Sequence, residues 1–400
     1  MSPMSSAPKG RPAHLWLTKS FWLVIFLTSL LACACAPISK LNFPPAGDNF
    51  DVYVENTIKH IEKNRKFLSN QPQSEVAWNS PRQWTPQEKT TRGILLIHGL
   101  GDSPYSFIDI GPKLASQGYL VRAILLPGCG TKSEDMIGVT IDDWRQAVKD
   151  QAELLASEVQ DLYLGGFSSG ANLALEYALN NQEKVKGLLL FSPAIKSTQS
   201  LDFLAPIINI FTHWINRPPK DPATASLMRY DAIPTDSMVI YYFSSVFLRR
   251  QLAKTSYYGP TLVILVRQDS IVDVRHIAHN FDKWFPNPNS RLIWYGDTDY
   301  VPKNAKRFLF KPDVFPEYRI DSFSHMSVLF SPLNPEYGLG GSQRICFNGQ
   351  GFVLFNRCLK GDDVWFSAWG DNRSGRVHAR LTFNPHFDWQ ASITAEVLGF

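Results

Sequence analysis

The sequence predicts an α/β protein with a mostly parallel central sheet that helices flank on both sides. Six short apolar runs alternate with helical patterns, and each run is continuously rich in Leu, Ile and Val. Such runs are typical of strands that are covered on both faces. The chain has 400 residues, of which 44% are hydrophobic and 19% charged, so it can bury a substantial core. The predicted strands span residues 93–98, 119–125, 161–166, 187–192, 261–266 and 291–296.

The beginning of the chain predicts an export signal over residues 1–35. Three basic residues precede the apolar run 21–31, which is short for a transmembrane helix and typical of a signal peptide; an uncleaved membrane anchor is the alternative. The sequence Leu-Leu-Ala-Cys ending at Cys33 resembles the bacterial lipoprotein box, which implies lipidation of Cys33, with Cys35 as the rival. Because Ala34 follows Cys33 instead of aspartate, the resemblance implies an exported lipoprotein of the outer membrane, facing the periplasm or the cell surface.

The rest of the chain divides into a core with two interruptions. A helix is expected early in the lead-in, because Val54, Ile58, Ile61 and Leu68 share one helical face. An apolar stretch without a sheet strand follows the fourth predicted strand, and it is interpreted as a helical cap. A Gly- and Asn-rich stretch near the end is interpreted as an irregular insertion. The predicted parts are a lead-in with its helix (36–92), the first part of the core (93–193), the cap (194–258), the second part of the core (259–330), the irregular insertion (331–380) and a C-terminal helix (381–400).

Residues 165–179, Gly-Gly-Phe-Ser-Ser-Gly-Ala-Asn-Leu-Ala-Leu-Glu-Tyr-Ala-Leu, contain a Gly-x-Ser-x-Gly pattern centred on Ser168. A strand precedes the pattern and a helix follows it. A serine on such a sharp turn needs glycine at the flanking positions, here Gly166 and Gly170, to avoid steric clashes. The helix N-terminus also favours developing negative charge. Ser168 is therefore the candidate nucleophile, whereas an ordinary turn between strand and helix is the plainer interpretation.

A serine hydroxyl needs a base and an orienting acid, and a sheet of this kind places them in the order Ser, Asp, His. His325 lies in a loop after a strand-like segment and is the candidate base, ahead of four other histidines that follow the acids. Two aspartates are alternative candidates for the orienting acid. Asp269 follows the first strand after the cap, whereas Asp299 follows the next strand and lies closer to His325 in sequence.

Several stretches between residues 90 and 330 resemble the α/β-hydrolases, in particular bacterial carboxylesterases and monoacylglycerol lipases. They are GILLIHGLGDSPYSF, LLPGCGTKSEDM, IDDWRQAV, GGFSSG, GPTLVILVRQDSIVD, RLIWY and SHM. In such enzymes the acid begins an Asp-x-x-Val pattern after the strand that follows the cap, which implies Asp269, with Val272, over Asp299. The long separation from His325 then implies an insertion at 297–323.

The same resemblance implies an oxyanion hole made by the backbone N–H groups of Leu100, in the His-Gly-Leu-Gly turn, and Ser169. His98 is then expected to order that turn and not to react. One residue departs from the family pattern, because Cys129 stands in a Gly-Cys-Gly loop where relatives carry histidine. A buried structural thiol is the expectation, and a redox-sensitive thiol is the alternative.

No tight Cys/His cluster is present, so the sequence predicts neither a metal nor a cofactor. Export would place the protein in an oxidising compartment, and Cys346 and Cys358 are therefore expected to form a disulfide. The net charge of +4 is small and no basic stripe stands out, which makes nucleic acid a poor candidate partner.

Together these features predict a serine hydrolase that cleaves carboxylic esters through Ser168, His325 and Asp269. The expected partners are a small ester or lipid substrate, namely short- or medium-chain esters, monoacylglycerols or lysophospholipids, and a membrane reached by the lipid anchor. The alternatives are a peptidase or acyltransferase with the same three residues, and a non-catalytic lipid-anchored envelope protein. The sequence indicates neither the acyl length nor the oligomeric state.

Overall fold

The computed structural model divides the chain into two units, residues 1–42 and 43–400. It describes residues 43–399 apart from 45, 200, 218–224, 372 and 374, all of them in the second unit. The predicted export signal, Cys33 and Cys35 lie outside the described residues. Within the described part of the chain, no helix has both the length and the apolar character needed to cross a bilayer.

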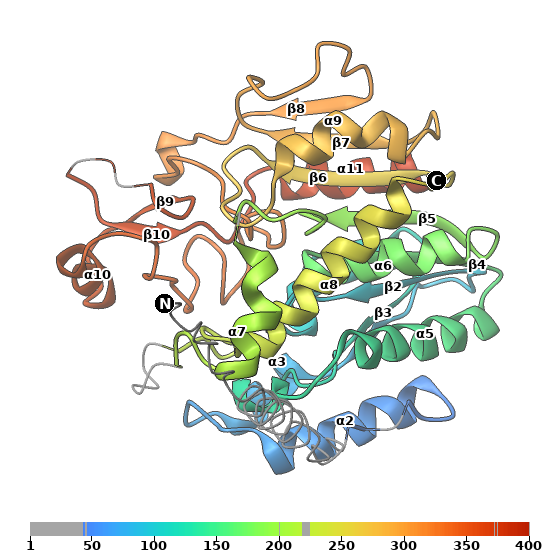
Figure 1. Cartoon of the computed structure of the whole chain (residues 1–400), viewed down its shortest axis with the longest axis horizontal. Helices are drawn as coiled ribbons and strands as arrows, with labels where there is room; N and C mark the ends of the chain where they lie inside the picture. The colour runs from blue at the N-terminus through green and yellow to red at the C-terminus, as the bar shows by residue number, and fades with distance from the viewer. Residues whose placement is uncertain are drawn as a thin grey trace, which may run out of the picture. The chain divides into compact units, whose positions relative to one another are not determined.

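An eight-stranded sheet forms the centre of the second unit, with strand order β1-β3-β2-β4-β5-β6-β7-β8 (Figure 1). All neighbouring pairs are parallel except β1 and β3. The strands are β1 (Arg82–Trp84), β2 (Arg92–Ile97), β3 (Leu120–Ile124), β4 (Asp161–Phe167), β5 (Val185–Phe191), β6 (Thr261–Val266), β7 (Arg291–Tyr295) and β8 (Phe308–Lys311). The predicted α/β fold class is confirmed, and all six predicted strands belong to this sheet.

Helices cover both faces of the sheet, which explains why its central strands are apolar throughout. Helices α4 (Ile110–Ser116) and α11 (Phe387–Leu398) contact each other and the sheet, and α5 (Ile141–Glu158) and α6 (Ser169–Asn180) form a second packed pair. The helix α9 (Val274–Trp284) connects β6 to β7. Fully buried side chains such as Ile94, Leu189 and Ile264 form the core with the residues of α4 and α11.

The predicted cap holds the short helices η3 (Asp202–Leu204) and α7 (Ala205–Phe211) and the long helix α8 (Thr235–Leu252). Its described residues add no strand to the main sheet, because the chain leaves at the end of β5 and returns in β6, the neighbouring strand. Helix α8 packs on α6 and α5, as Figure 1 shows, so this end of the segment is attached to the core.

The flanking regions differ in detail from what the sequence predicts. The first helix is α2 (Phe50–Asn64). It starts before Val54, because the Asn49 side chain caps it, and it ends before Leu68, which therefore does not share its face. It buries Phe50, Tyr53, Thr57 and Ile61, while Val54 and Ile58 stay half-buried. The lead-in also contains the helix α3 (Pro72–Asn79) and β1. The segment 381–400 becomes helical only at Phe387.

The predicted irregular insertion, residues 331–380, is termed the C-terminal lobe here. It contains the helix α10 (Phe352–Leu359) and a parallel pair of strands, β9 (Trp365–Ser367) and β10 (His378–Arg380). Cys346 and Cys358 are joined by a disulfide in a small apolar cluster of the lobe. The short elements β1, β8, β9 and β10 contain only three or four residues each, too few for a hydrophobic period to identify them from sequence.

Candidate active site

Ser168 occupies a strained turn between β4 and α6. Its φ of 54° and ψ of −117° are unusual for a residue with a side chain, and α6 begins at the next residue. The two flanking glycines are required by space. A Cβ on Gly166 would lie 2.5 Å from the Gly170 carbonyl, and a Cβ on Gly170 would lie 2.0 Å from the Ile97 carbonyl oxygen. The turn therefore packs directly on the end of β2, where the His-Gly-Leu-Gly turn begins.

Asp269 is buried just beyond the end of β6, and its carboxylate is fully engaged. Oδ1 accepts hydrogen bonds from the backbone N–H groups of Ile271 and Val272, both at 2.8 Å. Oδ2 lies 2.6 Å from Nδ1 of His325, and the Asp269 side chain is completely shielded from solvent. Because a carboxylate accepts, Nδ1 of His325 carries the proton and Nε2 is left as the basic nitrogen.

His325 lies next to the nucleophile turn. Its ring packs on that of Phe167, the residue before Ser168, with 4.9 Å between ring centroids. On the other side of the turn, a Cβ on Gly99 would be 3.4 Å from Cβ of Ser168. No hydrogen bond joins the described side chains of Ser168 and His325. Such contacts are often long in a free enzyme and shorten when substrate binds.

The rival acid Asp299 lies elsewhere. Its side chain is 64% exposed and pairs with Arg267 at 3.1 Å. Asp273 caps α9 through the His276 N–H and pairs with Lys196, so it is a structural residue. The remaining late histidines also have other surroundings: His276 packs on Trp284, His279 bonds the backbone of its own helix, His378 bonds Asp321, and His386 stacks on Tyr295.

The two predicted oxyanion donors are available for a ligand. Neither the Leu100 N–H nor the Ser169 N–H donates a hydrogen bond to an acceptor among the described residues. Ser169 is the first residue of α6, so its N–H is one of those that the helix leaves unpaired. Leu100 belongs to the same turn as Gly99, where an added Cβ would lie 3.4 Å from Cβ of Ser168.

His98 orders this turn through both ring nitrogens. The Leu126 N–H donates to Nε2 at 3.0 Å, so Nδ1 carries the proton and donates to the Gly99 carbonyl at 2.8 Å. The ring is completely buried, and burial lowers the pKa of His98 to about 4. The neutral ring thus connects the ends of β2 and β3. It holds the turn in place and does not act as an acid or base in the reaction.

Cys129 is a buried free thiol, and burial raises its pKa. The protonated thiol is a poor nucleophile, so this environment matches the structural interpretation and not that of a reactive thiol. The described residues contain no group of three or more His, Cys, Asp or Glu side chains arranged to hold a metal ion.

Two features of the site have no clear signal in the sequence. In the cap, Tyr230 donates its N–H to the Gly101 carbonyl at 2.7 Å and its hydroxyl to the Gly128 carbonyl at 3.1 Å. It thereby attaches the cap to the His-Gly-Leu-Gly turn and to the Gly-Cys-Gly loop. The second feature is a polar cluster around Asp321, four residues before His325, which contacts the C-terminal lobe. No sequence motif marks these residues, and their relation to the site is visible only in the folded structure.

The comparisons with known proteins agree with this architecture. Residues 94–254 match the family model of the alpha/beta hydrolase fold. A thermostable monoacylglycerol lipase of Bacillus sp. (strain H-257) is 31% identical over 103 residues, which are 26% of this chain and 41% of that protein. An uncharacterized abhydrolase domain-containing protein of Dictyostelium discoideum is 33% identical over 135 residues, 32% of this chain and 14% of that protein.

The chain thus spans less than half of the curated relatives that it matches. Among solved structures, a monoglyceride lipase from Saccharomyces cerevisiae aligns at 18% identity with a TM-score of 0.44, over 54% of this chain and 81% of that one. The sheet order, the turn between β4 and α6 and the match over residues 94–254 together show that this chain has the alpha/beta hydrolase fold.

Proposed function

We propose that this protein is a serine hydrolase that cleaves carboxylic esters, with Ser168 as nucleophile, His325 as base and Asp269 as the orienting acid. The observation that carries the proposal is the 2.6 Å bond between His325 Nδ1 and the buried Asp269, formed beside a strained serine. An imidazole held in this tautomer, next to a serine on a strained strand-to-helix turn, is the arrangement that acyl transfer requires.

The reaction follows from this arrangement. Nε2 of His325 takes the proton of the Ser168 hydroxyl while Oγ attacks the ester carbonyl, and the carbonyl electrons move to oxygen. The Asp269 carboxylate stabilises the imidazolium that forms. The tetrahedral intermediate expels the alcohol, which receives the proton from His325. Water, activated by the same imidazole, then hydrolyses the acyl-enzyme and releases the acid and free Ser168.

The negative oxygen of the intermediate binds between the N–H groups of Leu100 and Ser169. Neither N–H has an acceptor among the described residues, which supports this role, because two donors that are already oriented need no reorganisation as charge develops. Each such donor contributes on the order of 3 kcal/mol to lowering the barrier in other enzymes.

The substrate class is proposed from the cap and from the relatives. Helix α7 exposes Ile207, Ile210 and Phe211, with 53%, 78% and 81% of their surfaces accessible. An exposed apolar surface of this kind favours binding of substrates that carry an acyl chain. The matched relative is called a monoacylglycerol lipase. We therefore propose short- and medium-chain esters, monoacylglycerols and lysophospholipids, acted on by a lipoprotein that is exported and anchored through Cys33.

Hydrolysis of a p-nitrophenyl ester series of increasing acyl length tests the proposal on the full-length chain. We expect turnover by the wild type and its loss in Ser168→Ala, down to the background rate. Ser169→Ala keeps the backbone N–H of the oxyanion donor and provides a matched control with a neighbouring hydroxyl removed. The proposal is wrong if Ser168→Ala hydrolyses the esters as fast as the wild type.

A further inference from the structure

The loop that carries His325 takes a long path to reach its partner. The histidine loop, residues 312–330, starts at the end of β8, the edge strand of the sheet. Asp269 follows β6, two strands away, so the loop must cross the end of β7. Holding a long segment in one conformation costs chain entropy, and the 2.6 Å bond to Asp269 needs other contacts to hold the loop in place.

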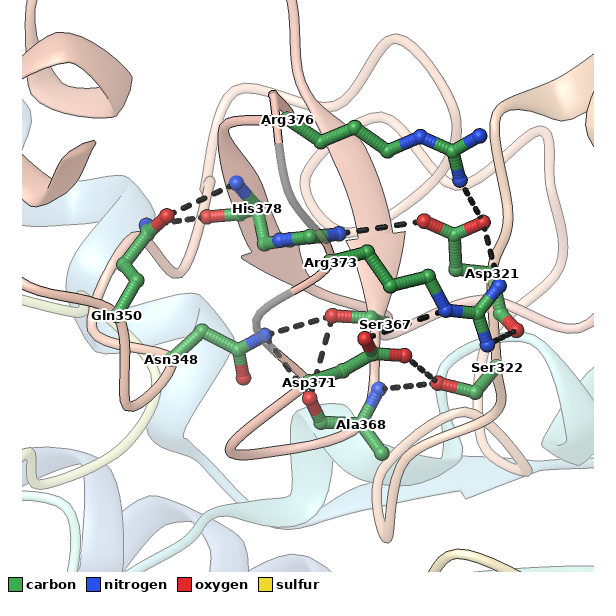
Figure 2. Close-up of polar contacts among 10 residues, drawn as sticks. All are labelled: Asp321, Ser322, Asn348, Gln350, Ser367, Ala368, Asp371, Arg373, Arg376 and His378. Carbon is green, nitrogen blue, oxygen red and sulfur yellow. Dashed lines mark hydrogen bonds and ion pairs between the residues drawn. The ribbon is translucent and has the colours of Figure 1, made fainter.

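The C-terminal lobe supplies several of these contacts through one buried carboxylate, Asp321 (Figure 2). Oδ1 of Asp321 is paired with Nη1 of Arg373 at 2.9 Å and with Nη1 of Arg376. Oδ2 lies 3.2 Å from Nε2 of His378, a completely buried residue of β10. Arg373 also donates to the Asp321 carbonyl oxygen at 3.1 Å. We name these four residues the Asp321 clamp.

Neighbouring positions of the loop are attached to the same lobe. The Asp321 N–H donates to the Phe366 carbonyl at 2.9 Å, and the Ala368 N–H donates to Oγ of Ser322 at 3.0 Å. Oγ of Ser322 in turn donates to the Asp371 carboxylate at 3.0 Å, as Figure 2 shows. These contacts reach to Ser322, three residues before His325.

We propose that Asp321 is a positioning residue for His325, and that the C-terminal lobe serves to fix the histidine loop through the Asp321 clamp. Asp321 touches neither Ser168 nor Asp269 through any described contact, so it acts on the reaction only by holding the imidazole in place. The consequence for catalysis rests on the proposed function. The consequence for the geometry of His325 does not, and it can be measured separately.

A conservative substitution, Asp321→Asn, can test the clamp, because both arginines that pair with Asp321 can reach solvent. Replacing Asp321 by Asn keeps the shape and removes the charge that two arginines share. Their side chains are 45% and 33% exposed, so both guanidinium groups can turn to water instead of remaining buried and unpaired. Asp362→Asn is the matched control, because Asp362 pairs with Arg357 in the same lobe, at 2.7 Å, without touching the histidine loop.

Two readouts on the full-length chain test the proposal. The first is kcat and KM for a p-nitrophenyl ester. The second is the far-downfield proton resonance of the His325–Asp269 hydrogen bond, assigned by its loss in His325→Ala. In Asp321→Asn we expect kcat to fall by roughly 10- to 100-fold at nearly constant KM, as for a displaced catalytic group, and the resonance to disappear. Asp362→Asn should match the wild type in both.

The proposal is overturned if folded Asp321→Asn keeps both wild-type kcat and the resonance. If Asp321→Asn does not fold, Arg376→Gln replaces it, since it removes one half-buried partner and keeps Asp321. A weakened resonance and a smaller loss of kcat then support the clamp, and wild-type values contradict it. The wild type could hydrolyse no ester while Asp321→Asn still abolishes the resonance. This result would support the clamp and refute the proposed function.

Discussion

At the residue scale, the choice of the acid depends on a contact between residues that are far apart in the chain. Separation in sequence favours Asp299, and the position after the strand favours Asp269. The structure places Asp269 against His325 and leaves Asp299 exposed beside Arg267. Spacing and strand position alone could not decide this, because the order of the strands and the path of the histidine loop determine which carboxylate the imidazole meets. Only the resemblance to α/β-hydrolases, through the Asp-x-x-Val pattern, favoured Asp269.

His98 gives the protein a defined dependence of stability on pH. Burial lowers the pKa of His98 to about 4, below its ordinary value, so the unfolded chain binds a proton that the folded chain rejects. Stability from this group is complete above about pH 6.5 and is lost as the pH falls towards about 4. The pKa difference corresponds to about 3 kcal/mol.

We therefore expect the free energy of unfolding to fall less between pH 7 and pH 4 in His98→Gln than in the wild type, by up to about 3 kcal/mol. Urea unfolding at a series of pH values measures the difference. His279→Gln is the control, since His279 lies exposed on α9. Parallel pH curves for His98→Gln and the wild type would show that His98 does not contribute this dependence.

At the scale of elements, the turn between β4 and α6 is the part of the site that a local motif predicts best. The Gly-x-Ser-x-Gly pattern encodes the backbone directly, because only glycine fits where the turn meets the end of β2. The apolar runs predict the inner strands for a similarly local reason. Edge elements such as β1, β8 and β9 depend on partners elsewhere in the chain, and no local pattern indicated them.

Gly170→Ala tests the space requirement of this turn. A Cβ there would lie 2.0 Å from the Ile97 carbonyl oxygen, and the backbone cannot move away as a flexible side chain could. We expect a loss of more than about 2 kcal/mol in the free energy of unfolding, as for an overpacked core site, together with loss of activity. Gly351→Ala is the control, because nothing lies within 4 Å of its added Cβ. Equal stability of both variants would contradict this account of the turn.

At the scale of the whole molecule, the sequence predicts the α/β core better than it predicts the role of the C-terminal lobe. The α/β fold class, the turn that carries Ser168 and the position of the cap follow from patterns within single segments. The role of the C-terminal lobe does not, because the Asp321 clamp joins residues that are about fifty positions apart and carry no motif. The lobe appears in the sequence only as a Gly- and Asn-rich stretch with two cysteines.

The disulfide of the lobe lies close to the Asp321 clamp. It joins Cys346 to Cys358 and lies in the apolar cluster that includes Val377 and Ala379, which flank His378 of the clamp. A disulfide is stable in the oxidising compartment that an exported lipoprotein would reach. Export, lipidation at Cys33, the disulfide and the positioning of His325 therefore form one consistent proposal for the whole chain.

The central claim is that Ser168 is a nucleophile activated by His325 and Asp269. The most direct measurement is the rate and position of covalent modification by a fluorophosphonate, followed by mass spectrometry of the digested protein. We expect one adduct, on Ser168, with Asp299→Asn labelled at the wild-type rate and Asp269→Asn more slowly by about 10³-fold or more. No adduct, an adduct on another residue, or slow labelling of Asp299→Asn instead of Asp269→Asn would contradict it.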